Sequence, residues 1–374
     1  SRAYTYLLNG LNVVSRRIRN YSFYCWLLSE YSKKVSTRDP RIQREFIRKA
    51  EYIIALGSVA NKLEGINGST YASKKLDTEA NKLTLSEGIY NQDGSTDETY
   101  WKFGFGIFGQ YYMGSMRQIR IIEEIADEFR NPLGIFRVTK DPNSNYVTGE
   151  ELAIAFAENI PIPKQQLLLS CIESDEIHRD QMFDLFPEFN MFEVPQGSQE
   201  NSLLIKMIMD ADDPKITQED VSFNRRDTFL HVLKFANQNS ESLQEHNFTR
   251  HSYYHKGMQN DELDETLFGW YYYQFNEFFR LACTACLNGI LNRLEEEEGW
   301  IHLFELIDIS VNEIIANLSL DSQTSAEQPL SQLLNNKFEV EQTLCNLMLK
   351  SKRFESMTYA IQLLLKLHQE NKDY

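Results

Sequence analysis

Apolar positions recur along most of the chain with the spacing of amphipathic helices. Asp39-Pro40 has the form of an N-cap followed by proline at the first helical position. Apolar side chains then recur three or four residues apart from Ile42 to Leu56, which predicts a helix. In the stretch 10–31 the second half is apolar and aromatic on every side, which indicates a helix buried all round. We therefore predict a mainly α protein with a multi-helical bundle architecture.

The first half of the same stretch is basic. Arg16, Arg17 and Arg19 lie within about one helical turn. If Asn12 or Ser15 caps the helix, these cations lie near the positive end of its dipole, where they are disfavoured. We therefore expect an anionic partner for them, either a carboxylate of the same chain, a second protein or a phosphate backbone.

Two short β-branched runs interrupt the helical pattern. Residues 135–139 and 146–147 flank a turn-forming segment that begins Asp-Pro-Asn, and this order predicts a β-hairpin. Thr148 and Glu151 then have the spacing of a capping box, which opens a new helix. Helix, hairpin and helix in this order predict a small winged-helix-like insertion.

Winged-helix modules bind DNA in some proteins and contact other proteins elsewhere. Here the basic residues are offset by nearby acids, which weakens the attraction to phosphates. A structural or protein-binding wing is therefore favoured, with a winged-helix DNA-binding regulator as an alternative. Three regions are expected: a basic N-terminal helical region (1–98), the winged-helix-like module (99–160) and a C-terminal helical domain (161–374). Two prolines within residues 160–163 mark the second boundary.

Composition supports a globular helical protein and adds an asymmetry of charge. The chain has 374 residues, 42% of them hydrophobic, with only 17 Gly and 9 Pro. Its formal net charge is −16, yet residues 1–60 carry eleven Lys and Arg against four Asp and Glu. This asymmetry predicts either a basic-on-acidic contact within the chain or a basic surface for a partner protein or nucleic acid. The candidate binding residues are Arg16, Arg17, Arg19, Arg41, Arg44 and Arg48.

An acidic run at residues 295–298 is the most obvious internal counterpart of these arginines. Arg16 and Arg19 share a face with Phe23, so we expect them to dock onto that run and hold the fold together. Arg17 is expected to face outward with the basic helix of residues 41–49. The opening stretch is thus first an anchor and only second a binding site.

One short motif has catalytic potential. Four residues, of which Asp227 is the first, separate Arg226 from His231, and this spacing resembles the HEPN ribonuclease signature. That resemblance implies an arginine that polarises a phosphate and a histidine that moves a proton at a ribose hydroxyl. On one helix, however, the two residues lie about 140° apart around the axis. A surface arginine and a hydrogen-bonded helix histidine is the favoured interpretation, and the ribonuclease is the alternative.

The sequence contains only weak signals for a metal site or a redox-active cysteine pair. His251 and His255 have the i, i+4 spacing of a metal pair, but no His-Glu-x-x-His motif accompanies them, and a surface loop rich in His and Tyr is favoured. Cys283 and Cys286 lie in an apolar helical pattern, which favours core packing over redox chemistry. No metal and no cofactor is therefore expected. An odd number of scattered cysteines, with no apolar run long enough to span a bilayer, predicts a cytoplasmic protein without a membrane partner.

Four further motifs stand out: Gly10-Leu-Asn, the Arg-x-x-Arg-x-Tyr-Ser-Phe-Tyr run that ends at Tyr24, Gly149-Glu-Glu-Leu-Ala-Ile-Ala-Phe and the aromatic segment 270–279. Together they resemble a group of uncharacterised prokaryotic proteins of anti-phage defence gene clusters. The resemblance implies a non-enzymatic bacterial subunit that works beside other subunits of a defence complex, such as an ATPase or a nuclease. It carries no catalytic residues to this chain.

Overall fold

The computed structural model describes the chain in two compact units, residues 2–233 and residues 234–374. The boundary between them falls within one helix, α11. The residues that the structure describes are 7–11, 15, 17–35, 39–63, 65–77, 81–141, 146–209, 222–239, 245–255, 258–259, 262–277, 291, 295, 302 and 305.

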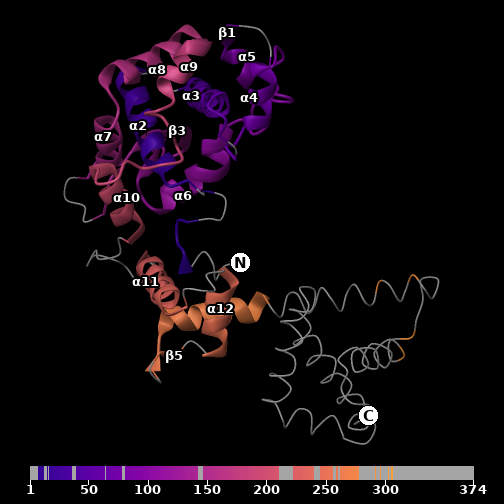
Figure 1. The fold of residues 1–374 in the computed structure, drawn as a ribbon, viewed down its shortest axis with the longest axis vertical. Helices are drawn as coiled ribbons and strands as arrows, with labels where there is room; N and C mark the ends of the chain where they lie inside the picture. The colour runs from indigo at the N-terminus through magenta and orange to yellow at the C-terminus, as the bar shows by residue number, and fades with distance from the viewer. Residues whose placement is uncertain are drawn as a thin grey trace, which may run out of the picture. The chain divides into compact units, whose positions relative to one another are not determined.

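The described part of the chain is mainly helical, as predicted (Figure 1). Its helices are α2 (Arg19–Lys34), α3 (Pro40–Ala60), α4 (Ser69–Leu76), α5 (Ser86–Ile89), the π-helix η1 (Phe108–Tyr112), α6 (Met113–Gln118), α7 (Gly149–Glu158), α8 (Ile162–Ser174), α9 (Arg179–Leu185), α10 (Gln199–Met209), α11 (Ser222–Gln238) and α12 (Glu245–Tyr254). Residues 265–277 are also helical. The strands are β1 (Lys82–Thr84), β2 (Ile122–Ala126), β3 (Pro132–Val138), β4 (Glu176–His178), β5 (Met258–Gln259) and β6 (Glu262–Leu263).

Helix α2 is the centre of the first unit. Every residue from Tyr21 to Leu28 is buried, which confirms that this helix is surrounded on all sides. Its aromatic rings pack against α7, where Phe23 and Trp26 both contact Phe156, and against the loop before α10, where Trp26 contacts Phe189. Burial of so many large rings supplies the main stabilising term for this unit, because apolar area removed from water is favourable roughly in proportion to its extent.

The helix begins later than the sequence pattern suggested. Its N-cap is Ile18, which makes no side-chain cap, so neither Asn12 nor Ser15 caps it. Arg17 therefore precedes the helix and Arg19 is its first residue. The expected position of three cations inside the first turn was wrong, and the dipole argument applies to Arg19 alone.

Two start signals read from the sequence are confirmed. The Asp39 side chain accepts a hydrogen bond from the backbone N–H of Arg41, and Pro40 opens α3. Thr148 and Glu151 form the predicted reciprocal capping box at α7. Both signals are local, since each is complete within four residues of chain.

The predicted hairpin exists, but its strand pairing was wrong. Residues 132–138 pair with β2, which precedes them, and not with residues 146–147, which form no strand. The turn lies at residues 127–131, where the Asp127 carboxylate accepts hydrogen bonds from the backbone N–H groups of Phe129 and Asn131. The order helix, hairpin, helix is retained, because β2 and β3 lie between α6 and α7.

Two further small sheets were not predicted. Strands β1 and β4, which are far apart in sequence, pair antiparallel in the first unit, and β5 pairs with β6 in the second. In the second unit, Phe248 of α12 packs edge-on against Trp270 and Phe235. His251 lies on α12 and His255 lies in the turn that follows it, so the loop expected for them was wrong; their ring centroids are 4.1 Å apart and the rings are tilted by 34°.

Candidate functional site

The predicted basic surface is largely committed to contacts inside the first unit. Arg19 is buried and its Nε lies 3.3 Å from Glu200 Oε1, while its Nη1 donates to the carbonyl oxygen of Asn190. Ser22 and Asn159 donate to the same carboxylate at 2.5 and 2.7 Å. Arg19 thus joins α2 to α7 and α10, and the expectation that it anchors the fold through a carboxylate of the same chain is confirmed. Its partner is Glu200 and not the acidic run 295–298, of which only Glu295 is described.

Arg48 was wrongly assigned to an exposed basic face. It is fully buried, and its guanidinium donates to the carbonyl oxygens of Ile89, Trp101 and Phe103 at 2.7, 2.8 and 2.5 Å. Every residue of α3 from Phe46 to Ser58 is buried, so this helix has no solvent face at that level. Arg48 therefore holds the loop 100–103 against α3 and is not available to a partner.

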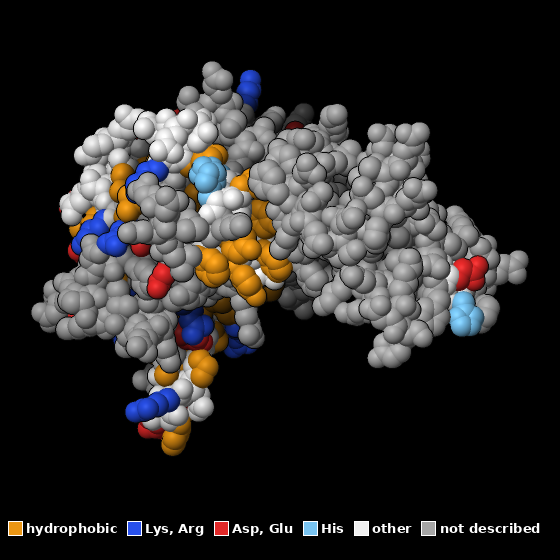
Figure 2. Space-filling model, turned by 90° about the horizontal axis from the view of Figure 1, so that it is seen from below, with side chains coloured by type: hydrophobic (Ala, Val, Ile, Leu, Met, Phe, Trp, Pro, Cys, Tyr) orange, Lys and Arg blue, Asp and Glu red, His pale blue; other side chains and the backbone are white. Residues whose placement is uncertain are grey.

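The other arginines of the set differ in exposure. Arg41 is exposed and paired with Asp39, the residue that caps its own helix. Arg44 is half-buried, with its guanidinium 3.7 Å from the centre of the Phe105 ring. Arg17 is also half-buried and lies 3.5 Å from the centre of the Phe192 ring. Arg16 lies outside the described residues. On the face drawn in Figure 2, the described Lys and Arg side chains form separate small groups, several of them with Asp or Glu alongside.

Arg226 and His231 both lie on α11, which confirms the helix assumed for them. Their five-residue spacing therefore directs them about 140° apart around the helix axis. Arg226 is half-buried and its Nε lies 3.2 Å from the carboxylate of the adjacent Asp227. One helix alone does not bring this pair to a common reaction centre.

The neighbouring Arg225 was not among the predicted site residues, and it has a structural role. It is buried and donates to the carbonyl oxygens of Met207 and Ile208 in the last turn of α10 and to that of Asn9. A cation at the C-terminal end of a helix satisfies carbonyl groups that lack intrahelical partners.

A cavity of about 230 Å³ lies in the first unit between α2, α3 and the π-helix η1. At its floor is Glu51, a buried carboxylate in the middle of α3. Glu51 Oε1 accepts hydrogen bonds from the Tyr24 hydroxyl and the Phe108 N–H, at 2.9 and 2.7 Å. Glu51 Oε2 accepts from the Tyr100 hydroxyl and, at 3.0 Å, from the Ile107 N–H.

The geometry of the η1 segment explains how two backbone N–H groups reach Glu51. Gly106 has a φ of +69°, and a Cβ at this position would overlap the Glu51 carboxylate. A side chain is therefore excluded where the chain turns toward α3. The π-helix follows directly, and such wide turns occur frequently at functional sites.

The electrostatics at the cavity floor are unusual because Glu51 has only uncharged hydrogen-bond donors around it. Burial raises the pKa of the Glu51 carboxyl above its ordinary value, and the four hydrogen bonds oppose that rise. Burial also raises the pKa of the Tyr24 and Tyr100 hydroxyls well above 10. At neutral pH both tyrosines are therefore protonated donors and not bases.

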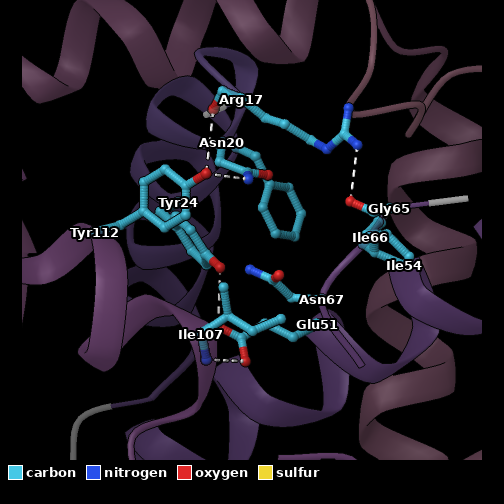
Figure 3. Close-up of a pocket in the computed structure, with 11 residues that line it drawn as sticks. Arg17, Asn20, Tyr24, Glu51, Ile54, Gly65, Ile66, Asn67, Ile107 and Tyr112 are labelled. Atoms are coloured by element: carbon cyan, nitrogen blue, oxygen red, sulfur yellow. Dashed lines mark hydrogen bonds between the residues drawn. The ribbon is translucent and has the colours of Figure 1, made fainter. Parts of the chain in front are cut away.

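The upper part of the cavity is formed by side chains with unused hydrogen-bonding capacity (Figure 3). Asn20 donates to the Tyr112 hydroxyl at 2.7 Å, but its carbonyl oxygen accepts nothing from the described residues. The Asn67 carboxamide points into the same space and has no hydrogen-bond partner within the described ranges. Arg17 crosses the mouth and donates to the Gly65 carbonyl oxygen at 2.9 Å. Phe23, Ile54 and Ile66 supply apolar walls.

Arg17 was predicted from the sequence as a binding residue, but the cavity that it borders was not predicted. Glu51 follows Arg48 by one helical turn on a helix whose apolar pattern looked one-sided. The signal available in the sequence was that Glu51 directly precedes the apolar run of residues 52–54 in this helix. In the part of the chain that the structure describes, His, Cys, Asp and Glu side chains form no group of three or more that could hold a metal ion. Among the described helices, none combines the length and apolar character needed to cross a bilayer.

Comparisons with known proteins identify no family for this chain. Neither a family model, nor a curated protein, nor a solved structure gives a match.

Proposed function

We propose that this chain is a non-enzymatic subunit of a bacterial anti-phage defence complex and that it binds a partner protein through the tip of the β2–β3 hairpin. The defence context rests on the resemblance of the motifs around residues 10–24 and 149–156. The proposed mode of binding rests on one observation: Phe129, at the tip of the hairpin, is exposed to solvent. Its side chain is 77% exposed, the largest value for a large apolar side chain among the described residues.

Phe129 is held out by an ordered turn. The Asp127 carboxylate accepts from the N–H groups of Phe129 and Asn131, and also from the Asn131 side chain. Arg130 has a φ of +66° in the same turn. An exposed aromatic ring on a fixed turn loses little conformational freedom on binding, and aromatic side chains are enriched among the residues that dominate interface energies.

The charges of the hairpin favour a protein over a nucleic acid as the partner. The Arg137 Nε lies 2.7 Å from Glu123, and Arg117 pairs with Glu124 at 3.3 Å. Paired cations attract phosphates weakly, and phosphate contacts supply most of the non-specific affinity of DNA-binding proteins. The buried positions of Arg19 and Arg48 remove two further cations from any phosphate-binding face.

The test is co-purification with the products of neighbouring genes, including any ATPase or nuclease encoded there. The tagged full chain is expected to retain one of these proteins after nuclease treatment of the lysate. Phe129→Ala should reduce the retained amount at least tenfold, while Phe183→Ala, at a second exposed ring on α9, should leave it unchanged. A chain that purifies alone and cleaves RNA, with cleavage abolished by His231→Ala, would contradict the proposal.

A further inference from the structure

The cavity above Glu51 has the features of a ligand site that the proposed partner binding does not use. All of its walls belong to the first unit: they are α2, α3, η1 and the loop that carries Gly65 and Asn67. Its volume of about 230 Å³ is below the range of roughly 300–1,000 Å³ typical of sites for drug-sized ligands. The size therefore indicates that no more than one substituted ring fits inside the cavity, so any further part of the ligand lies at the mouth.

Arg17 indicates that the ligand carries a negative charge. Its guanidinium is half-buried and stacked on Phe192, and among the described residues it has no carboxylate partner. Its one hydrogen bond goes to the neutral Gly65 carbonyl, which leaves Nε and Nη1 without partners in the described ranges. Burial lowers the pKa of Arg17, which is the direction expected for a cation that lacks a compensating anion.

The charges at the two ends of the cavity determine the orientation of such a ligand. Glu51 and its four donors occupy the floor, and an anion beside this carboxylate would be repelled. Arg17 is at the mouth, next to the exposed Gly65. The anionic group must therefore be at the mouth and the uncharged body of the ligand toward the floor.

The middle of the cavity indicates the chemistry of that body. The Asn67 carboxamide and the Asn20 carbonyl oxygen point into it with unused hydrogen-bonding capacity (Figure 3). Carboxamides read the alternating donor and acceptor edge of a nucleobase well, because each offers both N–H and C=O groups in one plane. The Phe23 ring and the side chains of Ile54 and Ile66 supply apolar contacts for the faces of a flat ring.

We propose that this cavity binds a single heteroaromatic ring with an amide-like edge and an anionic substituent, with the anion on Arg17 and the ring edge on Asn20 and Asn67. A ring carboxylate and a nucleoside monophosphate both carry this chemistry. The ring carboxylate carries its anion directly on the ring, so the whole ligand fits inside the cavity. The nucleoside monophosphate places only its base inside, with its sugar and phosphate at the mouth.

Isothermal titration calorimetry of the full chain distinguishes these two anionic ligands. The four probes are uracil-6-carboxylate, uridine 5′-monophosphate, uracil and inorganic phosphate. Saturable binding of the first or the second probe supports the site and identifies which anion it takes. Uracil should bind at least tenfold more weakly than the better of these, and phosphate alone should not saturate. Failure of both ring-bearing anions to bind, or phosphate binding as tightly as either, would overturn the proposal.

Variants locate the site. Arg17→Gln should weaken binding at least tenfold and Asn67→Ala about fivefold, the effect of losing one hydrogen bond. Arg41→Gln is the control, because Arg41 is an exposed arginine that is paired with Asp39 and does not line the cavity. This variant should bind the ligand like the wild type. If Arg17→Gln does not fold, Arg17→Lys, which keeps the charge but not the planar donor fork, should give an intermediate loss. Unchanged affinity in Arg17→Gln or Arg17→Lys would contradict the assignment.

Discussion

Two buried carboxylates, Glu200 and Glu51, are compensated in opposite ways. Glu200 faces the Arg19 guanidinium and accepts further hydrogen bonds from Ser22 and Asn159. Glu51 has four uncharged donors, two tyrosine hydroxyls and two backbone N–H groups, and no cation in hydrogen-bonding contact. Both are almost completely removed from solvent.

The difference shows what each carboxylate does for the fold. A charge pair depends on the side chain opposite, so Glu200 and Arg19 together fasten α2 to α10 across 181 residues of sequence. The Glu51 site depends instead on backbone geometry, because the N–H groups of Ile107 and Phe108 are aimed at it by a glycine turn and a π-helix. We expect Glu200 to be sensitive to loss of its cation and Glu51 to loss of its turn.

The largest effect is expected for Arg19→Ala. Removing the cation leaves Glu200 buried without a countercharge, which typically costs about 3–5 kcal/mol of unfolding free energy. Urea unfolding followed by tryptophan fluorescence measures it. The double variant Arg19→Met, Glu200→Met should recover a large part of the loss, because a buried ion pair can be replaced by apolar residues of similar size. If Arg19→Ala were as stable as the wild type, the ion pair would not contribute to the unfolding free energy as expected.

Gly106→Ala tests the turn at Glu51. The new Cβ would overlap the Glu51 carboxylate, and residue 106 has a positive φ. Overpacking typically costs ~1–3 kcal/mol, in addition to ~1–2 kcal/mol for an L-residue in the left-handed region. Gly94→Ala is the matched control, since its φ is +79° and no atom lies within 4 Å of the added Cβ. Equal unfolding midpoints for the two variants would remove the argument that Gly106 is required by Glu51.

Glu51→Gln should have a smaller effect. Glutamine keeps one acceptor oxygen, and a tyrosine hydroxyl can rotate to accept from its NH₂ group. A backbone N–H cannot rotate, so either Ile107 or Phe108 is left unsatisfied at a cost of ~1–3 kcal/mol. The chemical shift and exchange protection of these two amides report which one loses its partner. Retained protection at both would contradict the hydrogen-bond geometry.

The smallest effect is a dependence on pH. The native pKa of Glu51 is raised above the value of 4.5 that applies when the group is free, so between these two values the folded chain binds more protons than the unfolded chain. The contribution of Glu51 to the unfolding free energy therefore falls as the pH rises through this window. The difference in unfolding free energy between wild type and Glu51→Gln should decrease from pH 4.5 toward neutrality. A difference that increases over this range would mean that the four donors outweigh burial.

The parts of the fold that were predicted correctly are complete within a few residues of chain. The Asp39-Pro40 start and the Thr148–Glu151 capping box each depend on neighbours in sequence. The all-round burial of Tyr21–Leu28 was predicted because this run is apolar and aromatic on every side. The hairpin pairing was wrong because residues 121–122 are apolar in a way that suits a helix and a strand equally, and the partner strand was decided by register with residues 132–138. Of the residues that line the candidate ligand site, only Arg17 was predicted from the sequence to be a binding residue.

By itself the sequence determined a mainly helical protein, where several of its helices begin, and that the basic residues near its start need partners. Local hydrogen bonds and apolar periodicity are sufficient for these conclusions. Only the tertiary structure decided which carboxylate faces Arg19, why Arg48 is buried and how Glu51, Asn20 and Asn67 come to surround one cavity. Each of these depends on groups that are far apart in the chain and meet because the apolar faces of α2 and α3 must be removed from water. The arginines were visible as charges in the sequence, and packing divided them between anchors, exposed ion pairs and the mouth of a site.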